Sequence, residues 1–227
     1  LAGLYDGNVI IYNIETGKVV KAFEIAPGTP VRCARFVARL SLVVAGSDDF
    51  MLRAVNYNTG DKVAEQDAHT DYIRYVEPHP SSGALLTASD DMTLKLWDMG
   101  SGFKHVHTFE GHSHFVMMAR FNPKDANTFA SASLDRSVKV WTASGQAHTV
   151  EPNFSLDGHE RGVNCVDYFH GGDRPYLISG ADDHTLRIWD YQTRSCVTVL
   201  EGHSDNISAV LYPPRLPLIA SGSEDGT

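Results

Sequence analysis

Residues 111–141 read GHSHFVMMARFNPKDANTFASASLDRSVKVW, and this order of residue types recurs along the chain. The stretch opens with Gly-His, reaches Asp135 in a turn of small residues and ends at Trp141, six positions after that aspartate. Residues 138–141 have the two-residue rhythm and the β-branched and aromatic types of a half-buried strand. The stretch therefore predicts short strands joined by tight turns.

The same order returns with a nearly constant period. The turn aspartates are separated by 42 to 48 residues and are Asp6, Asp49, Asp91, Asp135, Asp183 and Asp225. Four histidines precede the aspartate of their own copy by 22 to 24 residues, at His69, His112, His159 and His203. Helical periodicity is absent over any useful length. A fixed period of this size is typical of repeat architectures, so we expect an all-β fold made of repeated sheets.

With Gly-His signatures, as in 111–112, and Trp-Asp signatures, as in 97–98 and 189–190, the chain resembles the WD40 family. The resemblance implies a β-propeller with four strands per blade. We expect seven blades in the parent protein and about five to six, an incomplete ring, in this chain. The expected single domain, 1–227, has complete blades at about 31–202 and blade remnants at 1–30 and 203–227. Because the chain starts at Leu1 and stops in mid-motif, we expect it to be a fragment.

A hydrogen-bond network explains why the periodic residues are polar. A His, an Asp in a tight turn, a Ser or Thr such as Ser89 or Ser179, and a Trp can bond across three strands of one blade. Such a network satisfies buried polar groups and fixes the strand register. The periodic histidines are therefore interpreted as structural.

Composition excludes several classes of function. Acidic residues outnumber basic ones by 28 to 19, for a net charge of −9, so no nucleic-acid partner is expected. No window holds 18 uncharged apolar residues, which excludes a membrane-spanning helix. Cys33, Cys165 and Cys196 are unpaired in spacing, which favours reduced cytosolic thiols over disulfides or a zinc site. A cationic or mixed partner suits this chain best.

Catalytic and metal motifs are missing. His105 with His107, and His112 with His114, have spacings that could hold zinc, but nothing predicts a third ligand. The chain contains no Gly-x-Ser-x-Gly, no phosphate-binding glycine loop and no His-Glu-x-x-His. We therefore expect no catalytic residue, no metal, no cofactor and no enzymatic activity.

Residues beside the periodic aspartates point to a binding face. If each turn aspartate faces the network, the preceding residue faces the end of the blade where loops gather. These residues are Tyr5, Asp48, Asp90, Leu134, Asp182 and Glu224. Residues after the Gly-His landmark should reach the same face: Asp71, Arg74, His114, Phe115, Arg161 and Asp205, with Arg32 at the equivalent place in the second copy. Clustered carboxylates repel one another unless a cation lies among them. An ordinary solvated acidic rim is the alternative.

Longer phrases resemble one branch of the WD40 family, the beta-prime subunits of coatomer, the COPI coat. The phrases lie at 31–39, 56–60, 71–74, 109–112, 114–117, 121–125, 131–136, 158–164, 175–183 and 189–193. The resemblance implies a cargo-recognition and scaffold subunit for Golgi-to-ER transport. Its partners would be di-lysine cargo tails and other coatomer subunits. It would lie in the cytoplasm and peripherally on Golgi membranes and COPI-coated vesicles, with membrane contact only through the coat.

The same resemblance implies a set of site residues on the top face. Binding of a C-terminal di-lysine signal falls on Tyr5, Arg32, Asp71, Arg74, Asp90, Phe115 and Asp182. The lysines would lie against the three aspartates, and the terminal carboxylate against Arg32. A generic WD40 scaffold that reads another basic peptide, or the alpha subunit of the same coat, are the alternatives.

Overall fold

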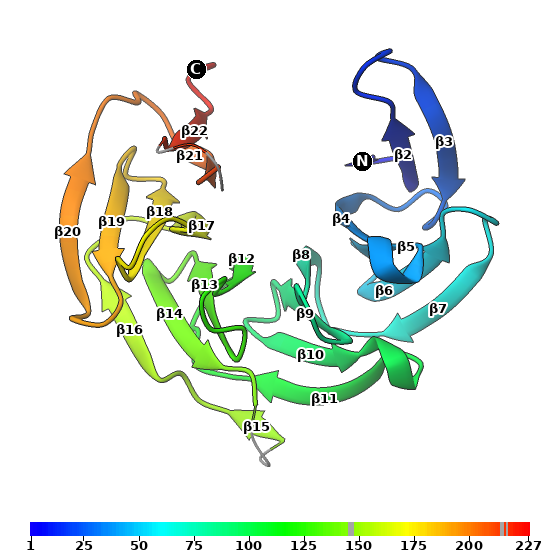
Figure 1. Cartoon of the computed structure of the whole chain (residues 1–227), viewed down its shortest axis with the longest axis horizontal. Coiled ribbons are helices and arrows are strands. Elements are labelled where there is room, and N and C mark those ends of the chain that lie inside the picture. Colours follow the sequence, from blue (N-terminus) through cyan, green and yellow to red (C-terminus); the bar gives the residue numbers. More distant parts are fainter. Residues whose placement is uncertain (145–147, 214–215, 217) are drawn as a thin grey trace. The chain divides into compact units, whose positions relative to one another are not determined.

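Antiparallel strands make up nearly all of the regular structure (Figure 1). The structure, a computed structural model, describes residues 1–144, 148–213, 216 and 218–227. Within these residues the only helices are two 3-10 turns, η1 (Ala38–Leu40) and η2 (Met99–Ser101). No helix in the described part is long and apolar enough to cross a membrane. The contacts divide the chain into an N-terminal unit, Leu1–His107, and a C-terminal unit, Thr108–Thr227.

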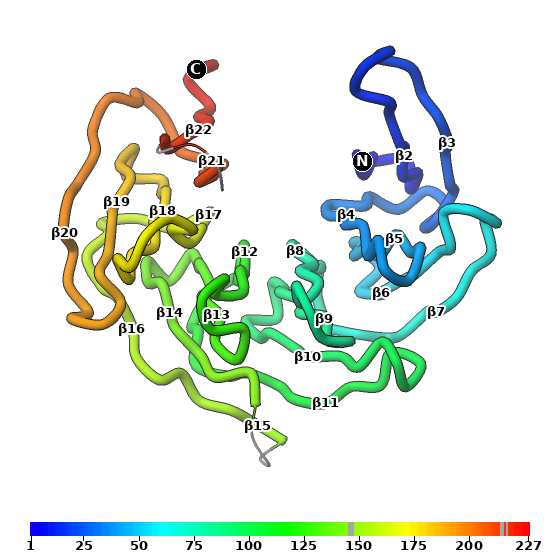
Figure 2. Tube along the Cα trace, in the orientation of Figure 1, coloured from blue at the N-terminus to red at the C-terminus, as the bar shows by residue number. Residues whose placement is uncertain are grey.

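The N-terminal unit contains sheets that follow the repeat. The first sheet has three strands, β1 (Ala2–Gly3), β2 (Asn8–Tyr12) and β3 (Val19–Glu24). The second has four, β4 (Val31–Val37), β5 (Leu42–Ser47), β6 (Met51–Asn56) and β7 (Lys62–Asp67). The third comprises β8 (Ile73–Pro78), β9 (Ala84–Ser89), β10 (Leu94–Asp98) and β11 (Lys104–Phe109), whose last two residues lie in the other unit. Figure 2 traces the up-and-down path of each sheet.

The C-terminal unit repeats the plan. Its fourth sheet is β12 (Val116–Phe121), β13 (Thr128–Ser133), β14 (Ser137–Thr142) and β16 (Phe154–Asp157). The fifth is β17 (Val163–Tyr168), β18 (Tyr176–Ala181), β19 (Leu186–Asp190) and β20 (Ser195–Leu200), and the sixth pairs β21 (Ile207–Leu211) with β22 (Ala220–Ser223). The short β15 (Thr149–Val150) pairs in parallel with the end of β11. The predicted all-β fold with four-stranded repeat sheets is confirmed.

The predicted polar network is present, and the fourth sheet shows its geometry. His112 Nδ1 lies 2.7 Å from Asp135 Oδ2, and its Nε2 lies 2.7 Å from Ser131 Oγ. Trp141 Nε1 donates to the same serine at 2.8 Å. A carboxylate only accepts, so Nδ1 carries the proton and Nε2 accepts from the serine hydroxyl. The corresponding groups are His69, Asp91, Thr87 and Trp97; His159, Asp183, Ser179 and Trp189; and His203, Asp225 and Ser221.

One member of the network was placed wrongly from the sequence. The hydroxyl between His69 and Trp97 belongs to Thr87, not to Ser89. Ser89 Oγ instead donates to the Asp71 carbonyl oxygen and accepts from the Asp91 amide. Residues 87 and 89 share one face of β9, so alternation alone cannot separate them.

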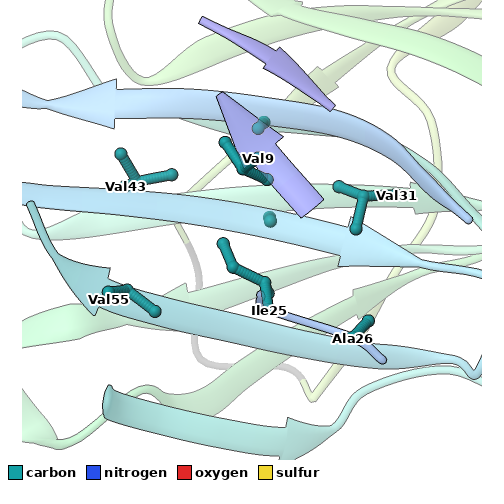
Figure 3. Close-up of a cluster of buried hydrophobic side chains, with 8 residues drawn as sticks. Val9, Ile25, Ala26, Val31, Val43 and Val55 are labelled. Carbon is teal, nitrogen blue, oxygen red and sulfur yellow. The ribbon is translucent and has the colours of Figure 1, made fainter. Parts of the chain in front are cut away.

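The second sheet replaces this polar network with apolar packing. Ala26, Ala45 and Val55 stand at the positions that hold the histidine, the hydroxyl and the tryptophan elsewhere. They are buried in one cluster with Val9 and Val31, which Figure 3 shows. The cluster therefore joins the first and second sheets by hydrophobic contact, without a titratable histidine.

Ion pairs link innermost strands of neighbouring sheets inside each unit. In the N-terminal unit Arg35 of β4 lies 3.9 Å from Glu77 of β8. In the C-terminal unit Arg120 of β12 lies 3.7 Å from Asp167 of β17, whose Oδ2 also accepts from the Tyr212 amide. The four charged residues are each the fifth of their strand, so basic and acidic side chains alternate at this position in the second to fifth sheets, whereas the sixth sheet has Leu211 there.

Stability is expected to fall as the pH drops below about 6.5. Burial lowers the pKa of His69, His112 and His159 from 6.5, although the neighbouring aspartates raise it. Burial raises the pKa of Asp183, but bonds from Thr185, the Glu160 amide and His159 lower it overall to about 2. Below each ordinary pKa the unfolded chain binds more protons than the folded one, so acid favours unfolding. The loss of stability due to the histidines begins near pH 6.5, and the loss due to Asp183 extends from about pH 4 to 2.

Urea unfolding at pH 8, 7, 6 and 5 measures this loss. A level free energy of unfolding between pH 8 and 7, followed by a decrease, is the expected profile. A profile that stays level from pH 7 to 5 would show that the folded histidines titrate like free ones.

Candidate functional site

Residues that precede the turn aspartates occupy one backbone position in the second to sixth sheets. Their amides donate to carbonyl oxygens at the start of the innermost strand, at 2.8 to 3.0 Å. The donor and acceptor pairs are Asp48 with Pro30, Asp90 with Tyr72, Leu134 with Phe115, Asp182 with Gly162, and Glu224 with Asn206. Side chains at these positions therefore share one end of each sheet.

Two arginine and aspartate pairs mark this end of the N-terminal unit. Arg32 donates from Nε and Nη2 to the two oxygens of Asp48, at 2.6 and 2.7 Å. Arg74 does the same to Asp90, at 2.7 and 2.5 Å. Hydrogen bonding to Asp48 raises the pKa of Arg32. Such two-point pairs are short, charge-assisted and geometrically specific. The acidic face expected from the sequence is thus largely one of paired charges in this unit.

Asp90 and Asp71 differ in what a ligand could reach. Asp90 is only 3% exposed, and both of its oxygens accept from Arg74. Asp71 is half-buried, and its Oδ1 accepts from the Tyr72 amide at 2.8 Å. Among the described residues no other donor to the Asp71 carboxylate is found. Asp71 is therefore the more accessible of the two carboxylates.

Two tyrosines flank the arginines. The Arg32 guanidinium carbon lies 5.8 Å from the ring centroid of Tyr5 and 5.3 Å from that of Tyr72. Arg74 lies 6.0 Å from the Tyr72 ring. Tyr5 is 76% exposed and Tyr72 is 38% exposed. All three separations are within cation–π range, so the rings and the guanidiniums form one connected surface.

The equivalent positions of the C-terminal unit carry different chemistry. Asp182 Oδ1 accepts from Asn164 Nδ2 at 2.6 Å, and a neutral amide leaves the carboxylate charge uncompensated. In the fourth sheet Met117 and Leu134 occupy the positions that Arg74 and Asp90 occupy in the third. The pair of side chains at these positions is therefore apolar in the fourth sheet.

Five of the seven predicted residues therefore lie in the N-terminal unit and are connected by the contacts described above: Tyr5, Arg32, Asp71, Arg74 and Asp90. Phe115 and Asp182 belong to the other unit, at matching strand positions. The predicted site set omits Tyr72 and also Asp48, although alternation places Asp48 on this face; its pairing with Arg32 was not predicted. Two signals could have found them. Phe115, which was selected, is the counterpart of Tyr72, and both arginines precede their aspartates by 16 residues.

The histidines considered for zinc have other partners. His105 Nε2 lies 3.0 Å from the His107 carbonyl oxygen, and its ring packs against Trp97. His112 has both ring nitrogens engaged by the structural network. In the described ranges no group of three His, Cys, Asp or Glu residues could hold a metal ion.

Comparison with known proteins identifies the repeat. Residues 60–98, 103–142, 150–190 and 194–227 match the family model described as WD domain, G-beta repeat. The chain is 57% identical over 217 residues to coatomer subunit beta'-2 of Arabidopsis thaliana, which covers 96% of this chain and 23% of that protein. It is 56% identical over 227 residues to coatomer subunit beta' of Drosophila melanogaster, covering 100% of this chain and 24% of that protein. It spans about a quarter of the length of these curated relatives.

Proposed function

The chain belongs to the WD-repeat family, in which it is similar to coatomer beta' subunits, and we propose that it acts in the COPI coat as a non-enzymatic cargo-recognition propeller. Its ligands are C-terminal di-lysine signals of cargo tails, and its other partners are coatomer subunits. It works in the cytoplasm, on the cytosolic side of Golgi membranes and COPI vesicles, and it contacts the membrane only through the coat.

The observation that carries this proposal is the arrangement of charges around Tyr72. A guanidinium flanked by Tyr5 and Tyr72 and a half-buried carboxylate, Asp71, belong to one end of the N-terminal unit. A C-terminal tail carries both complementary charges, a terminal carboxylate and lysine ammonium groups. Arg32 receives the carboxylate, because the pair with Asp48 uses only two of its five N–H groups.

The lysines are received by carboxylates of unequal access. Asp71 accepts an ammonium directly. Asp90 takes part when Arg74 yields one of its bonds, since both oxygens are occupied in the free protein. Asp182 and Phe115, in the C-terminal unit, are proposed contacts on the strength of the family resemblance. One exposed pair contributes only about 0.2 to 1 kcal/mol, so affinity for a single tail is expected to be weak, and several coat subunits on one vesicle raise it by avidity.

Exchanging Asp71 for lysine tests the proposal. Calorimetry with a peptide ending in Lys-Lys-x-x is expected to show at least about tenfold weaker binding to Asp71→Lys, because an attraction becomes a repulsion at short range. Raising the salt concentration should weaken binding to the unmodified protein.

The matched control is Asp61→Lys, which changes the net charge equally. Asp61 is exposed, in the turn after β6, at the opposite end of that strand from Asp49. Tail binding that drops equally in both variants would reduce the effect to overall charge. Unchanged affinity in Asp71→Lys would remove the site assignment.

A further inference from the structure

Tyr72 connects four of the residues proposed to bind the tail. Its amide donates to Asp71 Oδ1 at 2.8 Å, and its carbonyl oxygen accepts from the Asp90 amide at 3.0 Å. Its ring lies 5.3 Å from the Arg32 guanidinium and 6.0 Å from that of Arg74. One residue therefore contacts both the basic and the acidic parts of the surface.

We propose that Tyr72 is the positioning residue that makes this surface selective for a free terminal carboxylate. The inference rests on the proposed function, because it concerns how the same surface reads the end of a tail. Tyr72 acts through Arg32: its ring covers the guanidinium, whose Nε and Nη2 edge is fixed by Asp48.

Two restraints orient a planar guanidinium better than one. The bonds to Asp48 fix one edge of Arg32, while rings within cation–π distance restrict rotation of its plane. Tyr5 contributes a second ring but is 76% exposed, whereas Tyr72 is 38% exposed and packs 6.0 Å from Phe50. The better-buried ring is the more rigid restraint. Without it, the donors of Arg32 lose the fixed geometry that carboxylate recognition requires.

Other repeats show that this role is specific to the third sheet. The residues at the position of Tyr72 are Pro30, Phe115, Gly162 and Asn206. Phe115 is aromatic, but it precedes Met117 where Tyr72 precedes Arg74, so no arginine stands at that position in its sheet. The combination of an aromatic ring with two paired arginines is thus found around Tyr72.

The test compares free-acid and amidated forms of one di-lysine peptide by calorimetry on the intact protein. We expect the unmodified protein and Tyr72→Phe to prefer the free acid to the same degree, because both keep the ring. Tyr72→Leu should reduce that preference about two- to fivefold, with affinity for the amide unchanged. A merely structural role would weaken both forms alike.

Outcomes separate the two proposals. A preference for the free acid that survives intact in Tyr72→Leu overturns the role of Tyr72 and leaves the proposed function standing. An unmodified protein that binds neither peptide removes the proposed function and this inference with it. The Arg32 Nε–H resonance adds a readout without ligand: it should shift in Tyr72→Leu and not in Tyr72→Phe. An unchanged resonance in Tyr72→Leu contradicts the proposal.

Discussion

Replacing Trp141 by alanine is expected to lower the free energy of unfolding by about 3–5 kcal/mol. The side chain is fully buried, stacks on Phe129 at 6.1 Å and meets Phe109 edge-on at 5.8 Å. Its removal opens a cavity between these rings and takes away the indole N–H bond to Ser131. Three buried partners thus lose contacts at once.

Trp141→Phe separates packing from hydrogen bonding. It keeps a six-membered ring and so opens a smaller cavity than alanine does, but it loses the N–H donor, so its cost should be nearer 1–3 kcal/mol. Urea unfolding followed by tryptophan fluorescence and by circular dichroism measures both variants. Equal losses in the two variants would mean that the hydrogen bond, and not the packing, dominates at this position.

The second large effect concerns the pair of Arg74 and Asp90. Arg74→Met is expected to destabilise the protein by roughly 3 kcal/mol, because it leaves the carboxylate of Asp90 buried without its partner. We place it at the low end of the range for buried pairs, since the Arg74 side chain is 22% exposed. The double variant Arg74→Met with Asp90→Leu should recover to within about 1 kcal/mol of the unmodified protein. It reproduces the Met117 and Leu134 pair that the next repeat carries.

A double-mutant cycle on urea unfolding, with tail binding measured in parallel, checks this prediction. The double variant should remain stable while its affinity for a di-lysine peptide falls, because the methionine and leucine side chains cannot bind an ammonium group. If Asp90→Leu and Arg74→Met destabilise additively, the two side chains do not act as a pair. If the double variant binds the peptide normally, Asp90 has no part in recognition.

The repeat sheets could be predicted because their determinants recur in the sequence. The turn aspartate recurs six times, and four of the six are preceded by a histidine at a nearly fixed separation, so the copies reinforced one another. The second sheet shows the limit of this reasoning. Its period is kept by Asp49, yet Ala26 and Val55 replace the histidine and tryptophan, and Asp49 instead pairs with Arg53 at 2.7 Å. Asp49 is half-buried, and its partner is the cation that the neighbouring strand places beside it, which a periodic pattern does not reveal.

The sequence could predict which end of each sheet the turn-flanking residues occupy, but not how their charges are paired. Alternation along the strands selected Asp48 and Asp90 as residues at one end of their sheets, and their common backbone bonds agree with that. That each would be clamped by an arginine 16 residues earlier depends on cross-strand geometry. Charge counted along a sequence treats every carboxylate as equal, whereas the structure distinguishes Asp90, engaged at both oxygens, from Asp71.

The alternation of Arg35 with Glu77, and of Arg120 with Asp167, bears on how such a chain grows and folds. Sheets with the same sequence pattern can pack against the wrong neighbouring sheet while the chain is still partly unfolded. Contact between a sheet with a basic side chain at this position and one with an acidic side chain is attractive, whereas contact between two sheets of like charge is repulsive. The charges therefore favour the native order of the sheets, in addition to the chain connections. Duplication of a single repeat would place two side chains of like charge at this position in consecutive sheets. Duplication of two consecutive repeats would keep the alternation, so the charges favour gain or loss of repeats in pairs.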